Sequence, residues 1–129
     1  MILGIGTDLV QISRIEEMLK TFGSSFENKV FTDLEQKKAA SLPQNKRASF
    51  YAKRFAAKEA FSKALGTGIV GFSVKDVYIQ NDEKGKPLLI IENKAKEILE
   101  KLYGQCKIHI TMSHEKEYAV AFVIIENNL

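Results

Sequence analysis

The sequence predicts an α+β fold in which an antiparallel-rich sheet packs against a long central helix. Strand patterns come in paired runs in the second half of the chain, as in antiparallel hairpins. A long alanine-rich stretch has the composition of a single extended helix. Strand and helix patterns are mixed without the regular alternation that builds parallel sheets, which favours α+β.

Size and composition point to one domain over residues 1–129. Hydrophobic residues make up 45% and charged residues 27%, which is ordinary for a globular domain with one core. The N-terminal apolar run is too short for a membrane span and has no basic leader before it, so we expect no signal peptide, no membrane anchor and a cytoplasmic location. The lone cysteine, Cys106, agrees with a reducing compartment.

The charge balance excludes little. There are 19 Lys and Arg residues against 16 Asp and Glu residues, which gives a net charge of +3 and a pI near 8.9. This favours acidic partners over basic ones but is far below the charge of a dedicated nucleic-acid binder. We therefore expect no nucleic-acid partner.

The first predicted strand, residues 2–9, has two unlike faces. Because side chains alternate along a strand, Gly4, Gly6 and Asp8 share one face, which is bare and ends in a carboxylate. The other face carries Leu3, Ile5, Thr7 and Leu9. Glycine inside a strand usually marks the close approach of a ligand or another backbone.

The next segment predicts a helix that begins at a capping box. Ser13 is followed three residues later by Glu16, apolar residues recur at helical spacing, and Gly23 ends the pattern. Arg14 then lies in the first turn. Shorter helical patterns follow over residues 26–42 and end at Pro43.

The longest helix is predicted over residues 45–65 and ends at Gly66. A glycine-punctuated loop, residues 66–72, follows it; this loop lacks the Lys-Ser/Thr of a phosphate-binding P-loop. The second half then predicts two hairpins around one helix, in the order VYIQ, LLII, NKAKEILEKLYG, KIHITMS and YAVAFVII.

A strip of small side chains runs along the long helix. Ala52, Ala56 and Ala60 lie four residues apart, so they share one face. We expect this strip to pack against Gly4 and Gly6, because a bare strand face admits a helix closely.

That packing would bring two carboxylates together. Asp8 at the end of the strand and Glu59 on the helix would supply oxygen ligands for Mg²⁺, which is typically held by one or two carboxylates with waters and substrate phosphates. Local features leave a plainer alternative open. Asp8 could cap a helical turn with Gln11, and Glu59 with Lys63 has the order of an ordinary surface pair.

Other polar residues carry weaker signals. Lys53, Arg54 and Lys58 have, in isolation, the pattern of a solvated basic face of the long helix. Ser113 and His114 are adjacent, so their side chains point apart on an extended chain and do not form a nucleophile pair. A phosphate or ribose contact suits them better, with turn polarity as the alternative.

Four segments together resemble the holo-[acyl-carrier-protein] synthases, which are small 4′-phosphopantetheinyl transferases. The resemblance covers nearly the whole chain, and the joint order of the segments is far more specific than any one of them. The segments are GIGTDLVQISRI at residues 4–15, KRFAAKEAFSKALGTG at 53–68, the spaced elements GF, DV and GKP at 71–87, and SHEKEYAVAFV at 113–123.

The resemblance implies transfer of the phosphopantetheine arm of coenzyme A to a serine of apo acyl carrier protein, in support of fatty acid biosynthesis, with release of adenosine 3′,5′-bisphosphate. It implies that Asp8 and Glu59 are Mg²⁺ ligands and that Lys63 stabilises charge on the phosphates. The proton of the serine would go to a metal-bound water or to a carboxylate such as Glu59. Coenzyme A would be contacted by Arg54, Lys63, Gly66, Gly68, Ser113 and His114.

The resemblance also implies partners. Arg14 matches a basic position that faces the acidic carrier protein, and family members of this length are similar in forming homotrimers with sites between subunits. One departure stands out: Glu115 replaces a threonine that is common in similar proteins. Two other classes remain to be tested against this one, a non-catalytic CoA- or nucleotide-binding module and a small nucleic-acid binder.

Overall fold

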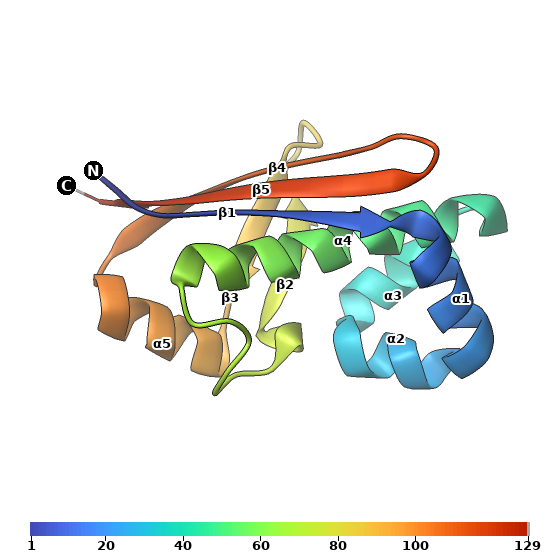
Figure 1. Cartoon of the computed structure of the whole chain (residues 1–129), viewed down its shortest axis with the longest axis horizontal. Helices are drawn as coiled ribbons and strands as arrows, with labels where there is room; N and C mark the ends of the chain where they lie inside the picture. Colours follow the sequence, from blue (N-terminus) through green and yellow to red (C-terminus); the bar gives the residue numbers. More distant parts are fainter. Residues whose placement is uncertain (129) are drawn as a thin grey trace.

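The computed structural model describes residues 1–128 and has the predicted α+β architecture, with a sheet lying along a long helix (Figure 1). The elements in chain order are β1 (Ile2–Gln11), α1 (Ile12–Phe22), α2 (Ser24–Val30), α3 (Asp33–Ala40), α4 (Gln44–Leu65), the 3₁₀ turn η1 (Val74–Asp76), β2 (Val77–Asn81), β3 (Pro87–Ile91), α5 (Asn93–Tyr103), β4 (Cys106–His114) and β5 (Tyr118–Asn127).

The main sheet has the strand order β1-β5-β4, with both pairs antiparallel. The N-terminal strand therefore lies beside the C-terminal one, and the backbone N–H of Asn127 donates to the carbonyl of Met1 at 3.0 Å. Strands β2 and β3 form a separate antiparallel hairpin. The two predicted hairpins around α5 are thus confirmed.

Helix α4 packs under the main sheet, with α1–α3 at one end of the molecule and α5 at the other (Figure 1). The predicted contact of the alanine strip with the glycines is confirmed at Ala60 and extends to Ala64, one turn beyond the predicted strip. A Cβ built on Gly4 would lie 2.1 Å from the carbonyl oxygen of Ala64, and one on Gly6 would lie 2.0 Å from that of Ala60. These distances are far inside van der Waals contact, so only glycine allows the strand to lie this close to the helix.

The apolar face of β1 points outward. Ile5 and Leu9 are 59% and 64% exposed, whereas Gly6 on the opposite face is buried. On β5 the inward residues are fully buried and pack over α4: Ala119, Ala121, Val123 and Ile125. The main sheet is therefore apolar on both faces, and α4 covers one of them.

Helix α4 begins and ends close to its predicted bounds, and Gly66 closes it in the left-handed conformation at φ 88°. The predicted capping box of the first helix is wrong. Helix α1 begins at Ile12, so Ser13 lies inside it, and Gln11 caps it without a side-chain hydrogen bond. The backbone N–H of Ile12 instead donates to the carbonyl of Glu117 at 2.8 Å, a tertiary contact that replaces the local cap. Gly23 ends α1 as predicted.

Candidate active site

Asp8, Glu59 and Lys63 meet where β1 crosses α4. Asp8 lies on the sheet face that packs on the helix, opposite Ala121 of β5. The ammonium of Lys63 lies 3.0 Å from Oδ1 of Asp8, which joins the strand to the helix. The Asp8 side chain is 16% exposed and that of Lys63 is 55% exposed, so the group opens to solvent on one side.

Glu59 completes this group one turn before Lys63. Burial is the main cause that raises the pKa of Glu59, the negative charge of Asp8 raises it further, and Lys63 lowers it. The two carboxylates are therefore close enough to repel each other. Such repulsion is relieved by a bound cation or by a proton. The predicted convergence of Asp8 and Glu59 is supported by this electrostatic coupling.

The donor set suits a hard cation with few protein ligands. Within residues 1–128, no three His, Cys, Asp or Glu side chains form a metal cluster. Mg²⁺ is usually held by one or two carboxylates, with waters and substrate phosphates filling its octahedron. Two half-buried, mutually repelling carboxylates beside an open surface fit that requirement.

The residues at the end of β4 face different sides of the sheet. Ser113 stands opposite Val120 of β5, in the outward row that also contains Leu9. His114 is close enough to Lys53 of α4 for that charge to lower its pKa, although burial lowers it more. The structure thus brings His114 toward α4, on the side of Asp8, and places Ser113 on the opposite face within one chain.

The loop after α4 begins three residues after Lys63 and turns through two glycines. Gly66 and Gly68 have φ values of 88° and 71°, which L-residues rarely adopt. The N–H groups of both glycines turn back to the carbonyl of Ser62, at 3.1 and 3.3 Å. The loop therefore holds a defined shape at the end of the helix that carries Glu59 and Lys63.

The basic residues earlier on α4 correct one expectation. Arg54 and Lys58 are not on a solvated face, because they are 5% and 1% exposed. The guanidinium of Arg54 stacks on Phe50, with Cζ 3.6 Å from the ring centroid. Lys58 pairs with Glu35 of α3 at 2.9 Å. Sequence reasoning passed over Glu35, although the spacing from Thr32 to Glu35 is a capping-box signal, and the structure confirms that cap.

Arg14 lies in the first turn of α1 and is exposed, as predicted. It is on an element separate from the strand and helix that hold the carboxylates. A surface role for this arginine is compatible with that placement.

The sheet and central helix define a class of protein already known from solved structures. A holo-(acyl-carrier-protein) synthase from Bacillus anthracis, solved in complex with CoA (3′,5′-ADP), has a TM-score of 0.83 and 40% identity over 99% of both chains. The Neisseria meningitidis holo-[acyl-carrier-protein] synthase has a TM-score of 0.89 and 39% identity, covering 98% of this chain and 100% of its own. The fold is therefore that of holo-[acyl-carrier-protein] synthases.

Sequence comparison gives the family. The model of the 4′-phosphopantetheinyl transferase superfamily matches residues 4–123, and this chain belongs to that superfamily. Curated relatives include the holo-[acyl-carrier-protein] synthase of Bartonella quintana, 48% identical over 98% of this chain and 96% of its own. That of Vibrio atlanticus is 46% identical over 98% of both chains. The resemblance predicted from the sequence is confirmed.

Proposed function

We propose that this protein transfers the 4′-phosphopantetheine group of coenzyme A to a serine hydroxyl of apo acyl carrier protein and releases adenosine 3′,5′-bisphosphate. The observation that carries the proposal is the group formed by Asp8, Glu59 and Lys63, two coupled carboxylates and a lysine on one open edge. Relatives that cover almost the whole chain bear the name of this activity.

We propose that Asp8 and Glu59 hold Mg²⁺. When bound, this ion neutralises charge on the diphosphate of coenzyme A and orients it for attack at phosphorus. The repulsion between the two carboxylates supports the assignment, because their combined charge favours a divalent cation. Gly4 and Gly6 set the distance at which Asp8 approaches the helix, since any side chain there would push the strand away from α4.

We propose that Lys63 stabilises the phosphate charge. Its ammonium lies at the mouth of the site and pairs with Asp8 through a single exposed contact, which costs little to exchange for a phosphate oxygen. Attack at phosphorus spreads negative charge over the surrounding oxygens, so a positive group held beside them lowers the barrier. Lys63 is therefore a catalytic residue in this proposal.

We propose that Arg54, the loop at Gly66 and Gly68, and the pair Ser113 and His114 contact the nucleotide part of coenzyme A. His114 lies on the sheet face toward α4, close enough for the positive charge of Lys53 to act on it. Ser113 faces outward, so it would reach a site only on a neighbouring copy of the chain.

We propose that the active protein is a homotrimer with sites between subunits. The support is the apolar outer face of the main sheet, where Ile5, Leu9 and Tyr118 are 59%, 64% and 39% exposed. Sedimentation equilibrium tests this. The wild-type protein should sediment as three copies, and Leu9→Lys should shift it toward the monomer; a monomeric wild type contradicts the proposal.

We propose that Arg14, exposed on α1, faces the acidic carrier protein. The net charge of +3 favours such a partner. No helix in residues 1–128 is long and apolar enough to cross a membrane. We propose that the protein works in the cytoplasm, in fatty acid biosynthesis.

Intact-mass spectrometry of an apo acyl carrier protein tests the activity directly. With this protein, coenzyme A and Mg²⁺, the carrier should gain about 340 Da, and a chelator should prevent the gain. A carrier with its acceptor serine replaced by alanine is the control and should gain nothing. If several carriers gain no mass although coenzyme A binds, the chain is a non-catalytic CoA-binding module and the proposal fails.

A further inference from the structure

Lys58 is the most deeply buried cation found among residues 1–128, at 1% exposure. Its ammonium donates to Oε1 of Glu35 at 2.9 Å, to the carbonyl of Val77 at 2.6 Å and to that of Val74 at 3.4 Å. All three donors are therefore used, and they join α4 to α3 and to the chain that enters β2. We call Glu35 and Lys58 the buried clamp.

Glu35 uses only one of its two carboxylate oxygens. Oε1 accepts from Lys58 and also from the backbone N–H of Thr32, at 3.0 Å. Oε2 is buried and has no hydrogen-bond partner within residues 1–128. Lys58 and the backbone of Thr32 are therefore both held through a single oxygen of Glu35.

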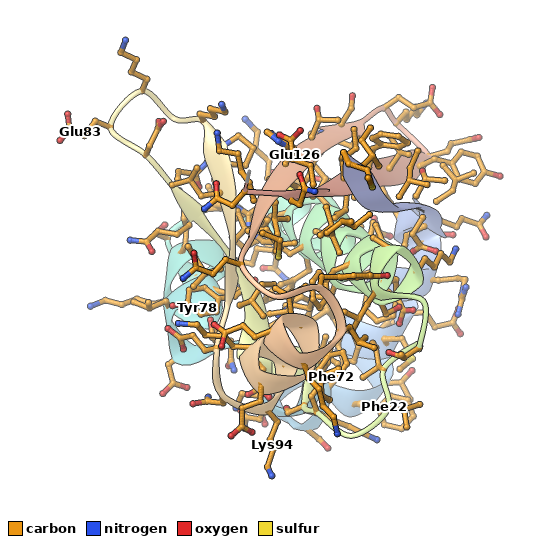
Figure 2. All side chains as sticks on the ribbon, turned by 90° about the vertical axis from the view of Figure 1, so that its left-hand side faces the viewer. Phe22, Phe72, Tyr78, Glu83, Lys94 and Glu126 are labelled. Carbon is orange, nitrogen blue, oxygen red and sulfur yellow. The ribbon has the colours of Figure 1, made fainter. Side chains whose placement is uncertain are left out.

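Arg54 lies one turn before Lys58 on α4 and lines the same hollow as Glu35, about 250 Å³ in volume between α3, α4 and β2. Tyr78 of β2, also a lining residue, is labelled in Figure 2 on this side of the molecule. The face of the guanidinium rests on Phe50. Its N–H groups lie in the guanidinium plane, so stacking leaves them available for a bidentate bond to an anion.

Two buried cations, Arg54 and Lys58, share this region with the buried carboxylate of Glu35. The other buried carboxylate nearby, that of Asp76, accepts instead from the backbone N–H of Ser73 and the side-chain amide of Asn93. Burial lowers the pKa of Arg54 to about 10, and the charge of Glu35 opposes that shift. Glu35 therefore stabilises the buried guanidinium, and the remaining positive charge favours an anionic ligand in the hollow.

We propose that the buried clamp is a positioning device for Arg54: Lys58 fixes Glu35, and the negative charge of Glu35 keeps the guanidinium in the hollow that Glu35 and Arg54 both line. The clamp would then set the affinity for coenzyme A without touching the coenzyme. The inference rests on the proposed function, in which Arg54 binds the nucleotide part of coenzyme A. It adds Glu35 and Lys58 as positioning residues. Lys58 fixes the wall of the hollow at β2, and Glu35 supplies the charge that keeps Arg54 in place.

Glu35→Gln tests the charge with little change of shape. We expect the KM for coenzyme A to rise roughly tenfold while kcat stays within about twofold, because the loss is in binding and not in phosphate transfer. In an Arg54→Ala background the same substitution should change the KM by less than about twofold, since two residues that act through one another are not additive. An equal rise in both backgrounds overturns the proposal.

The double variant Glu35→Leu with Lys58→Met separates positioning from stability. Apolar residues in place of a buried ion pair usually keep or raise stability, so the melting temperature should stay near that of the wild type. The KM for coenzyme A should nevertheless remain raised. If the buried clamp only stabilises the fold, the apolar pair should fill its place and the KM for coenzyme A should equal that of the wild type. A wild-type KM in the double variant therefore overturns the proposal.

Isothermal titration with coenzyme A, without carrier protein, keeps the two proposals apart. If the wild type binds coenzyme A but transfers nothing, the proposed function fails, and the ratio of Kd values between Glu35→Gln and wild type still tests the clamp. A ratio of roughly ten supports it, and a ratio near one overturns it. If the wild type does not bind coenzyme A, both proposals fail.

Discussion

Helix α4 contributes lysines to two ion pairs of nearly equal length and opposite surroundings. Lys63 lies 3.0 Å from Asp8, with side chains 55% and 16% exposed. Lys58 lies 2.9 Å from Glu35, with both side chains 1% exposed. The N···O distances cannot tell the two pairs apart. The two pairs differ in the other groups that surround each ammonium, which are water at Lys63 and backbone carbonyls at Lys58.

In the open pair, water and an incoming phosphate compete for the same ammonium, so the pair is weak and exchangeable. In the buried pair, the ammonium of Lys58 bonds Glu35 and two backbone carbonyls, so all three of its donors are already in use. One lysine is thus free to act on a substrate, and the other fixes three elements. The two lysines are of the same residue type and have similar N···O distances, so it is burial that distinguishes the lysine proposed for catalysis from the lysine that stabilises the fold.

The largest effect expected is the loss of transfer in Asp8→Asn or Glu59→Gln. Each removes a carboxylate charge from the open group, and we expect transfer to fall by about 10³-fold or more because the metal-binding charge is halved. The melting temperature should change little, since the group is partly exposed. Intact-mass time courses measure the rate. Near-normal turnover in both variants would place these carboxylates among structural residues.

The next effect compares the two lysines directly. Lys58→Met leaves Glu35 buried without its partner, so we expect a loss of about 3–5 kcal/mol in the free energy of unfolding. Lys63→Met, the matched control on the same helix, should cost less than about 1 kcal/mol because its pair is exposed. Urea denaturation measures both. Transfer should show the reverse order among folded proteins, with Lys63→Met the slower; equal unfolding losses would contradict the comparison.

The sequence predicted that Asp8 and Glu59 converge, but it predicted neither the Asp8–Lys63 pair nor the buried pair. Asp8 and Glu59 could be brought together from local patterns, because the bare face of β1 and the small strip of α4 are each visible in a short window. Lys58 has the spacing of a solvated basic face, and its partner Glu35 lies 23 residues earlier on another helix. No local periodicity joins the two. The burial of Lys58 depends on tertiary packing, because α3 and β2 cover this part of α4.

The other misplaced feature has the same origin. The start of α1 is fixed by a bond from Ile12 to Glu117, at the far end of the chain, which overrides the capping signal at Ser13. The outward direction of the apolar face of β1, in contrast, follows from the predicted packing of α4 on the glycine face. Strand pairing and the bounds of α4 likewise follow from alternation, turns and a glycine cap, which are local.

A smaller effect concerns pH. Because burial and Asp8 raise the pKa of Glu59, we expect it to protonate above the usual range of glutamate, and transfer should fall with falling pH through that raised pKa. Higher Mg²⁺ concentrations should move the acidic limb to lower pH, since the ion competes with protons for the carboxylates. Lys63→Met should raise this pKa further, because Lys63 lowers it in the wild type.

Carbon-13 NMR of the Glu59 carboxyl during a pH titration measures that shift without relying on residual activity. Lys58→Met serves as the control at a temperature where it stays folded, since Lys58 is not among the charges that act on Glu59. If the pKa of Glu59 is the same in Lys63→Met as in the wild type, Lys63 does not act on Glu59. The Lys63–Asp8 and Lys58–Glu35 pairs would then differ in burial but not in their relation to the proposed metal site.

The smallest effect expected is at Glu115, in the turn between β4 and β5. Its carboxylate lines a hollow with Leu9, Ser113 and His114, so it adds negative charge beside a proposed phosphate-binding segment. Glu115→Thr should lower the KM for coenzyme A by about twofold at low salt, and the gain should shrink as salt screens the charge. Glu117→Thr, in the same turn, is the matched control and should change the KM less. If the gain persists at high salt, the effect comes from a contact made by the threonine and not from the lost charge of Glu115. The exposed charge at the open end of the site would then have little influence on coenzyme A binding, in contrast to the buried charge of Glu35.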